Sequence, residues 1–364
     1  MEDLCAKAIN RDFVFCIFLW RCAVICCIMA DDGFLWEAQS VMKGDILELL
    51  QSVDGYISGE EMAERLGVTR AAIWKNIVSL REEGYDIASA PRSGYILRGV
   101  PDHLIEREIA RGLSTHIIGR SIFSYDTVNS TNIVAKELAQ KGAAEGTVVV
   151  AEQQGTGRGR LERSFFSPYG KGIWVSIILR PAFLPQDAPK CTLLAAVAVA
   201  HAMEMFGLRA EIKWPNDILH DGRKLVGILT EMSAEVDRVN YVVIGIGINV
   251  NIAMEDFPEE LRSVATSLMQ MKGEPLPRVA FLQELLRSLD ALYADVTREG
   301  FASVFHAWRS YAVTLGQSVH VIGIGGDSFD GIAADIDAEG ALLIDTDTGR
   351  RRVLAGDVSI RPQK

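Results

Sequence analysis

The chain has 364 residues, of which 49% are hydrophobic and 23% charged, and its formal net charge is -11. A chain of that length is longer than a typical single domain, so two or three domains are expected. The ordinary composition excludes a mostly disordered chain. The negative charge argues against a generally basic nucleic-acid binder, so any DNA contact must come from a local basic face.

Five of the six cysteines lie within the first 27 residues, and only Cys191 lies in the remainder. No Cys/His pair in that remainder has zinc spacing, and its single cysteine excludes a disulfide framework for the body of the chain. This cysteine usage predicts a cytoplasmic protein.

Residues 1–41 differ in character from the rest of the chain. The run from Phe13 to Ala30 is apolar but is interrupted by Arg21, which is costly in a membrane span, and the acidic start is not that of a signal peptide. Three interpretations stay open: an extension without a role in the fold, a marginal membrane anchor, or a partner-binding helix. In the first of them Met42, which immediately precedes the first predicted helix, is the native start.

Residues 42–100 are predicted to form a winged helix-turn-helix. Ser58 followed by Glu61 is a capping box, Gly67 breaks that short helix, and Thr69 begins the next one. Two short helices joined by a glycine-containing turn are typical of the helix-turn-helix. The apolar face of the second helix is formed by Ile73, Ile77 and Leu80.

The opposite side of this second helix is predicted to enter a major groove. Its candidate DNA-binding side chains are Thr69, Arg70, Trp74, Lys75 and Asn76. The run from Tyr85 to Leu97 predicts a two-stranded wing, with Arg92 at its tip as a phosphate contact. The alternative is a docking or dimerisation module with a solvated charged face.

After a linker and a short amphipathic helix (residues 99–120), a central block of about 118–312 mixes strands and helices. Ser130-Thr131-Asn132 opens a helix, either as simple capping residues or as polar groups for a ligand. The strand-like run 147–152 leads into a loop in which arginines alternate with glycines, Gln154 to Arg163. Glycine permits close backbone approach and arginine matches carboxylate and phosphate oxygens, so the loop predicts a small anionic ligand.

Two further stretches of this block carry polar residues at strand ends. Lys213 to Asp217 precedes an Asp221-Gly222 hairpin, and Lys224 follows the turn. Lys224 is a surface residue by default, but beside the arginine loop it becomes a point charge for a reacting anion. The run Tyr241 to Asn251 contains Gly245 and Gly247 without the third glycine or the following helix of a dinucleotide motif, so it is interpreted as a ligand-lining strand.

Residues 313–364 contain short strands separated by glycine-containing turns, which predicts a small all-β barrel or sandwich. The run Arg350-Arg351-Arg352 is interpreted as a solvated strand edge, with a lid over an anionic ligand as the alternative. Leucine and aromatic stripes near residues 282–308 are interpreted as core packing.

Together these motifs resemble the biotin–protein ligase family, in the bifunctional class that also acts as biotin operon repressor. The resemblance rests on Gly157-Arg158-Gly159-Arg160 with Arg163, on Lys213 to Asp217, and on Arg223 to Ile228. It covers about residues 42–364. It implies an α+β multidomain fold: a winged helix-turn-helix (42–100), a mixed α/β ligase domain of class II synthetase type (118–312), and an SH3-like β-barrel (313–364).

The resemblance also implies an activity. Biotin and ATP with Mg²⁺ would give biotinyl-5′-AMP, and the biotin would pass to a lysine of the biotin carboxyl carrier protein. Operator DNA would be bound by a homodimer promoted by biotinyl-AMP, and no membrane partner is expected. The alternatives are a ligand-sensing repressor without ligase activity and a ligase for another carboxylic acid such as lipoate.

Residue roles are implied by the same resemblance. The catalytic roles fall to Lys224, Arg158 and Arg160. The biotin pocket is formed by Ser130, Thr131, Asn132, Gln154, Arg158, Gly159, Arg160, Lys224, Gly227, Gly245 and Gly247. The ATP contacts come from Arg160, Arg163, Lys213, Asn216, Asn249 and Arg361, and no residue is assigned as a metal ligand. Phe165 stands where the family often has Trp.

Overall fold

The computed structural model describes residues 33–157, 159, 164–323, 328–354 and 358–362, of which 33–41 and 358–362 are described by their backbone only. The chain divides into two units, Met1–Pro101 and Asp102–Lys364, and each is described by itself. The predictions for residues 1–32 lie outside the described residues.

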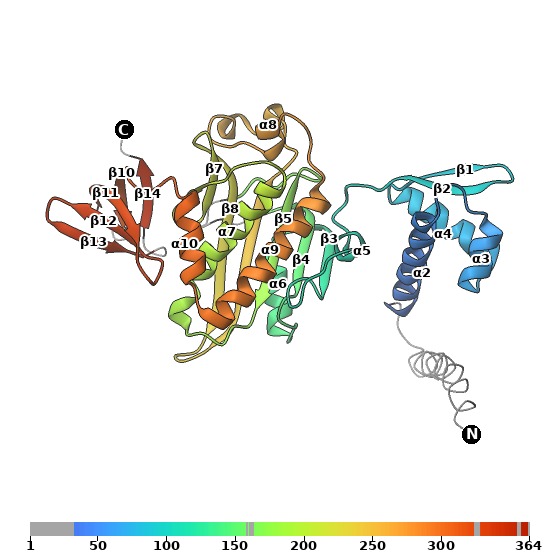
Figure 1. Cartoon of the computed structure of the whole chain (residues 1–364), viewed down its shortest axis with the longest axis horizontal. Helices are drawn as coiled ribbons and strands as arrows, with labels where there is room; N and C mark the ends of the chain where they lie inside the picture. Colours follow the sequence, from blue (N-terminus) through green and yellow to red (C-terminus); the bar gives the residue numbers. More distant parts are fainter. Residues whose placement is uncertain (1–32, 158, 160–163, 324–327, 355–357, 363–364) are drawn as a thin grey trace, which may run out of the picture. The chain divides into compact units, whose positions relative to one another are not determined.

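The first unit is a winged helix-turn-helix (Figure 1). The Ser58 hydroxyl accepts the Glu61 N–H at 3.0 Å and that of Thr69 accepts the Ala72 N–H at 3.2 Å, so both predicted caps are confirmed. Its elements are α2 (Gly33–Ser52), α3 (Gly59–Leu66), α4 (Arg70–Glu82), β1 (Asp86–Ala90) and β2 (Gly94–Gly99). The antiparallel β1–β2 pair is the predicted wing.

The N-terminal boundary of this unit differs from the prediction. Helix α2 begins at Gly33, so Met42 lies inside the helix and does not precede it. The segment before Met42 holds good helix formers and no proline, and the helix therefore extends backwards past the apolar positions that identified it. Within the described residues, no helix is both long and apolar enough to cross a membrane.

The second unit is built on a mixed seven-stranded sheet of order β3-β4-β5-β9-β8-β7-β6. The β3–β4 pair is parallel, and the other neighbouring strands pair antiparallel. The strands are β3 (Ile122–Val128), β4 (Val148–Gln154), β5 (Gly172–Leu179), β6 (Glu211–Lys213), β7 (Asp217–His220), β8 (Arg223–Ala234) and β9 (Val239–Asn249). The helices are α5 (Glu106–Ala110), α6 (Thr131–Gln140), α7 (Lys190–Met205), α8 (Leu268–Lys272), α9 (Arg278–Glu299) and α10 (Ala302–Tyr311), with 3₁₀ turns at Pro185–Asp187, Met254–Asp256 and Glu259–Leu261.

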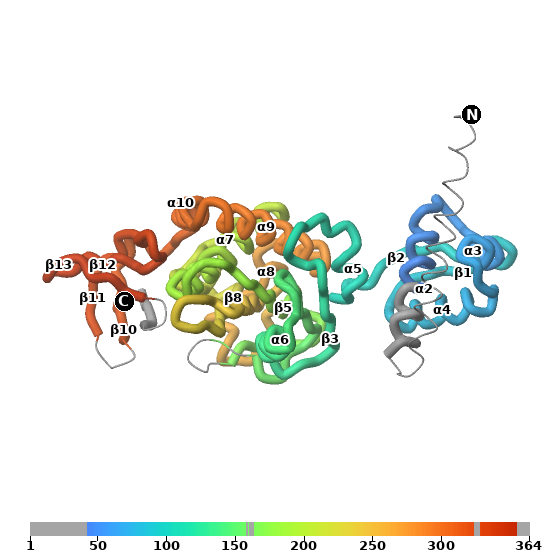
Figure 2. The backbone as a smooth tube through the Cα atoms, turned by 90° about the horizontal axis from the view of Figure 1, so that it is seen from below, coloured from blue at the N-terminus to red at the C-terminus, as the bar shows by residue number. Residues whose placement is uncertain are grey.

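The two faces of the sheet are covered differently, as Figures 1 and 2 show. Alternate side chains of β5, Ile173, Val175 and Ile177, join the core formed with α7 and α9. Because neighbouring strand residues point to opposite faces, Trp174 and Ser176 lie on the other face, where α6 packs. The candidate site lies on this second face.

The C-terminal segment forms a five-stranded antiparallel sheet of order β13-β12-β11-β10-β14, which confirms the predicted small β domain. Its strands are β10 (Ser318–Gly323), β11 (Ser328–Ile336), β12 (Leu342–Thr346), β13 (Gly349–Val353) and β14 (Val358–Pro362). Its contact with the ligase sheet includes the Trp214 indole N–H, which donates to the Gly340 carbonyl at 3.2 Å.

The three arginines of β13 lie on an exposed edge strand and have partners within their own sheet. Arg350 pairs with Asp345, Arg351 lies over the Phe329 ring, and Arg352 pairs with Asp337 and Glu339. This arrangement favours the solvated-edge interpretation over a lid.

A buried ion network joins the start of the second unit to the sheet. Arg278 on α9 is 2% exposed, and its Nη1 lies 2.7 Å from Glu152 Oε2. The same Nη1 donates to the Gly172 carbonyl at 3.1 Å, and Nε donates to Asp102 Oδ2 at 3.2 Å.

We expect Arg278→Ala to lower the free energy of unfolding by about 3–5 kcal/mol, because the buried Glu152 carboxylate loses its cationic partner and keeps, among the described residues, only the Leu104 N–H. Denaturant unfolding of the full chain measures this. The exposed Arg298 of the same helix is the control, and Arg298→Ala should leave the unfolding curve nearly unchanged. Equal unfolding curves for the two variants would show that the network does not stabilise the fold.

Candidate active site

A small pocket opens on the α6 face of the sheet. It encloses about 50 Å³. It is lined by Ser130, Thr131, Asn132, Gln154, Gly159, Phe165, Asn216, Lys224, Gly227, Ile228, Leu229, Gly245, Ile246 and Gly247. These residues come from the start of α6, the end of β4, the arginine loop and the segment after it, the turn between β6 and β7, and the paired strands β8 and β9.

The floor of the pocket is made by glycines at alternate positions of β9. A Cβ at Gly245 would lie 2.0 Å from the Asn132 Oδ1, and one at Gly247 would lie 2.8 Å from the Phe165 ring. Gly227 of β8 pairs with Gly247, and a Cβ there would also lie 2.8 Å from Phe165. The strand glycines therefore make room for two side chains that lie over the sheet.

Lys224 reaches the rim of the pocket from the tight β7–β8 hairpin, in which Asp221 and Gly222 have φ of 49° and 73°. Its backbone is held on the other side, because its N–H donates to the Val264 carbonyl at 2.7 Å. The Nζ lies 2.7 Å from Asp217 Oδ1 and 5.6 Å from the centre of the Phe165 ring. The side chain is 36% exposed, so the ammonium can meet a ligand that enters the pocket.

A chain of hydrogen bonds crosses the end of the pocket nearest α6. Asn132 Nδ2 donates to Glu231 Oε2 at 2.8 Å, and the Ser176 hydroxyl donates to Asn132 Oδ1 at 2.6 Å. Ser176 Oγ also lies 2.8 Å from Thr131 Oγ1, and the Thr131 N–H donates to Gln154 Oε1 at 2.9 Å. The buried polar groups are thus linked to one another beneath the ligand space.

Ser130 and Asn132 do more than cap α6. Ser130 stands at the N-cap position, but its hydroxyl makes no capping hydrogen bond. Asn132 uses its amide for the tertiary contacts above and for a long contact of 3.4 Å to the Leu229 carbonyl. The simple-capping interpretation therefore does not hold: the Ser130 hydroxyl makes no cap, and neighbouring strands supply the partners of Asn132.

Phe165 fills part of the space over the two paired glycines. Its ring meets Trp174 edge to face at a centroid distance of 5.9 Å, and its N–H donates to the Gly157 carbonyl at 2.8 Å. Ligand pockets generally enclose about 300–1,000 Å³, far more than the 50 Å³ here. The Phe165 ring, which lies against Gly227 and Gly247, is one of the groups that limit this space.

Most of the predicted site residues that are described come together in this pocket. Lys213 and Asn249 are not among its lining residues. Asn249 is 4% exposed and donates to the Thr266 carbonyl at 3.0 Å, while its Oδ1 has no hydrogen-bond partner among the described residues. Arg361 is described only by its backbone, paired with His320. Arg158, Arg160 and Arg163 lie outside the described residues.

Two members of the site were not predicted, and a third had only a minor role. Ser176 is a hydroxyl in an otherwise apolar buried strand, and that pattern could have identified it. Glu231 has no local signal, since only the tertiary fold brings it to Asn132. Phe165 was noted only for replacing a tryptophan, yet it covers the pocket floor.

On the helix-turn-helix, the predicted DNA-binding side chains share an open face of α4. Thr69, Arg70 and Lys75 are exposed, and Trp74 is 60% exposed, which is unusual for so large an apolar side chain. Asn76 is partly buried and donates to the Ala72 carbonyl of its own helix at 2.9 Å. Arg92 lies exposed in the wing turn.

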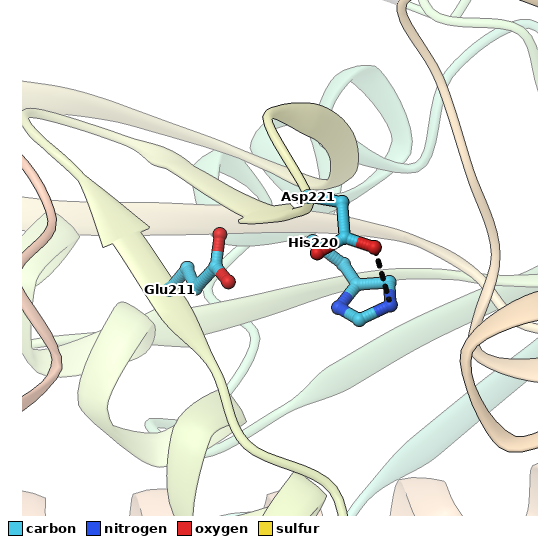
Figure 3. A group of neighbouring side chains, drawn as sticks. All are labelled: Glu211, His220 and Asp221. Atoms are coloured by element: carbon cyan, nitrogen blue, oxygen red, sulfur yellow. Dashed lines mark ion pairs between the residues drawn. The ribbon is translucent and has the colours of Figure 1, made fainter.

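Outside the pocket, one group of possible metal ligands occurs in the described part of the chain (Figure 3). Glu211, His220 and Asp221 place their ligand atoms within 4.8 Å of one another. Asp221 is exposed and the other two are partly exposed, and no further carboxylate, imidazole or thiol of the described residues joins them. The group carries no metal assignment.

The chain matches three family models in sequence order: "HTH domain" over residues 43–96, "Biotin/lipoate A/B protein ligase family" over 124–249, and "Biotin protein ligase C terminal domain" over 314–361. It is 44% identical to the bifunctional ligase/repressor BirA of Bacillus subtilis over 324 residues, which cover 88% of this chain and 99% of that protein. The chain belongs to the bifunctional biotin ligase/repressor family.

Other members of the biotin ligase/repressor family agree with this assignment. The Escherichia coli BirA is 32% identical over 305 residues, covering 84% of this chain and 92% of that protein. Among solved structures, the biotin protein ligase from Aquifex aeolicus in complex with biotin and ATP aligns with a TM-score of 0.59 and 27% identity, covering 67% of this chain and all of that one.

Proposed function

We propose that the pocket on the α6 face binds biotin and joins its carboxylate to the α-phosphate of ATP. As a member of its family, the chain is an ATP-dependent biotin–protein ligase and a DNA-binding repressor. The observation that carries the site assignment is the placement of one cation, Lys224, at the rim of a glycine-floored pocket whose far end is a connected polar network.

Biotin would lie with its ring system at the α6 end. There Ser130, Asn132 and Gln154 offer donors and acceptors for a polar ring, and the rim cation lies at the other end of the pocket. Lys224 would bridge the biotin carboxylate and the α-phosphate. Two anions repel as they approach, and a fixed ammonium between them offsets that repulsion most strongly in the transition state.

The nucleotide would extend along β9 towards Asn249. The buried Oδ1 of Asn249 lacks a hydrogen-bond partner among the described residues, and so does the buried Oγ1 of the neighbouring Thr266. A buried acceptor without a donor is costly, so a ligand N–H such as an adenine amino group would stabilise it. Asn216, Lys213, Arg160, Arg163 and Arg361 complete the proposed ATP contacts, with Mg²⁺ carried by the nucleotide phosphates.

The loop with Arg158, Gly159 and Arg160 would close over biotinyl-5′-AMP and exclude water, because the mixed anhydride hydrolyses readily. Phe165 ends this segment on the pocket floor. Entry of the ligand would displace its ring from the paired glycines and reopen the space needed by the adenylate.

The acceptor would be a lysine of the biotin carboxyl carrier protein, and the DNA partner an operator bound by a homodimer that biotinyl-AMP promotes. One observation supports the dimer. In the described chain, residues 230–234 of β8 pair with β9 on one side and with no strand on the other, which leaves a sheet edge able to pair with a second copy.

We place the domains at 42–100, 118–312 and 313–364, and the cysteine usage favours the cytoplasm.

Calorimetric titration of the full chain with biotin and with lipoate tests the ligand assignment. We expect saturable binding of biotin and no binding of lipoate at the same concentrations. Lipoate binding in place of biotin would assign the site to another carboxylic acid. Sedimentation with and without biotin plus ATP–Mg²⁺ tests the dimer, and an unchanged monomer in both conditions would contradict it.

A further inference from the structure

We infer that Glu231 is a positioning residue of the ligase reaction: it fixes the orientation of the Asn132 amide and so sets which atoms of the pocket donate and which accept. This inference rests on the proposed biotin site. It concerns a residue on β8 that does not line the pocket itself.

The argument starts from what each group can do. A carboxylate only accepts hydrogen bonds, whereas a carboxamide has one end that donates and one that accepts. Glu231 Oε2 lies 2.8 Å from the Asn132 Nδ2, so the carboxylate requires the NH₂ end of the amide to face it. The amide oxygen must then face the opposite way, towards Ser176.

Ser176 alone could not impose this orientation. A hydroxyl donates or accepts equally well, so Ser176 would tolerate either end of the amide. The ion pair between Lys136 Nζ and Glu231 Oε1, at 2.7 Å, engages the other oxygen of the carboxylate and holds it towards α6. Glu231 is therefore the close acceptor that fixes the orientation of the Asn132 amide, and the longer contact of 3.4 Å from Nδ2 to the Leu229 carbonyl favours the same orientation.

The orientation of the Asn132 amide then determines where the neighbouring hydroxyls donate their hydrogens. Ser176 Oγ lies 2.6 Å from Asn132 Oδ1 and 2.8 Å from Thr131 Oγ1, and it has only one hydrogen. Because Asn132 Oδ1 cannot donate, the Ser176 hydrogen is used there, and the Thr131 hydroxyl must supply the hydrogen of the second contact. The Thr131 Oγ1 also lies 3.2 Å from Gln154 Oε1, but its single hydrogen is then directed to Ser176 and not to Gln154.

Gln154 is the last side chain in this series of hydrogen bonds. Its Oε1 keeps the Thr131 backbone N–H as a donor at 2.9 Å and has a second lone pair left for a ligand N–H. Its Nε2 donates to the Ser167 hydroxyl at 3.1 Å, and that hydroxyl donates to the Phe165 carbonyl at 3.0 Å, which fixes the amide of Gln154 as well. A cyclic urea carries N–H groups, and the second lone pair of Gln154 Oε1 stays free for one of them only while Glu231 holds the Asn132 amide in place.

The test compares Glu231→Gln with matched variants by calorimetry with biotin and by steady-state kinetics of adenylate formation. Glutamine can present either end of its amide, so Asn132 can turn over, and we expect biotin to bind about 10- to 100-fold more weakly. The KM for ATP should stay unchanged. Glu231→Asp keeps an acceptor-only group and should recover much of the affinity.

Two controls separate positioning from charge and from folding. Lys136→Met removes the cation but leaves the acceptor carboxylate, so it should weaken biotin binding less than Glu231→Gln does. Glu235→Gln removes a surface ion-pair partner of Arg238 and should bind biotin as the wild type does. In the double variant Asn132→Ala with Glu231→Gln, the loss should equal that of Asn132→Ala alone. Additive losses, or wild-type affinity in Glu231→Gln, would overturn the inference. Failure of the wild type to bind biotin would instead overturn the proposed function.

Discussion

Replacement of Lys224 by alanine should lower the rate of biotinyl-adenylate formation by at least about 10³-fold, while most of the affinity for biotin is retained. The reason is that Lys224 is the described cation at the pocket rim, 2.7 Å from Asp217 and turned towards the space where two anions must meet. Its charge contributes most when the carboxylate and the phosphate approach one another. Single-turnover release of pyrophosphate, with biotin affinity measured in parallel, gives both quantities.

Lys171→Ala is the control for this experiment, because Lys171 is an exposed lysine that also has an acidic partner, Asp256 at 3.2 Å, but lies outside the pocket. It should form the adenylate at the wild-type rate. Equal rates in Lys224→Ala and the wild type would remove Lys224 from the reaction. A loss of biotin binding as large as the loss in rate would make it a binding residue only.

The double variant Arg70→Ala with Lys75→Ala should weaken operator binding by about 10²–10⁴-fold and leave biotin ligation unchanged. Both side chains are exposed on α4, beside Trp74, and each contact of this kind contributes about 1–3 kcal/mol. The slope of binding affinity against salt concentration should also fall, since two cations are lost. Fluorescence anisotropy with labelled operator DNA over a salt series measures both effects.

Arg65→Ala serves as the control for DNA binding. Arg65 is an exposed arginine of α3 that already pairs with Glu61 at 2.5 Å, and it should contribute little. If Arg65→Ala weakened DNA binding as much as the double variant did, binding would depend on the overall positive charge of the unit, and α4 would not be the recognition helix. An unchanged affinity in the double variant would favour the docking interpretation of this unit.

Local signals in the sequence predicted much of the fold. The caps at Ser58 and Thr69, the Asp221-Gly222 turn and the glycine pattern of β9 each depend on a few neighbouring residues, and the structure contains all of them. The start of α2 was placed too late, because a helix continues past its apolar positions when nothing stops it.

The parts of the site that were missed depend on contacts between distant segments. Asn132 was interpretable as a capping residue until the fold brought Ser176 and Glu231 to its amide, 44 and 99 positions away in the chain. Phe165 covers Gly227 and Gly247 only because β8 and β9 pair in one register. Local patterns cannot encode such register and packing.

The most direct test of the account is transfer itself. The full chain is incubated with biotin, ATP–Mg²⁺ and an apo biotin carboxyl carrier domain, and the intact mass of the carrier is measured for the wild type and for Lys224→Ala. We expect one biotinyl group on a single carrier lysine with the wild type and almost none with the variant. Biotin binding by the wild type without any transfer would contradict the account and identify the chain as a ligand-sensing repressor.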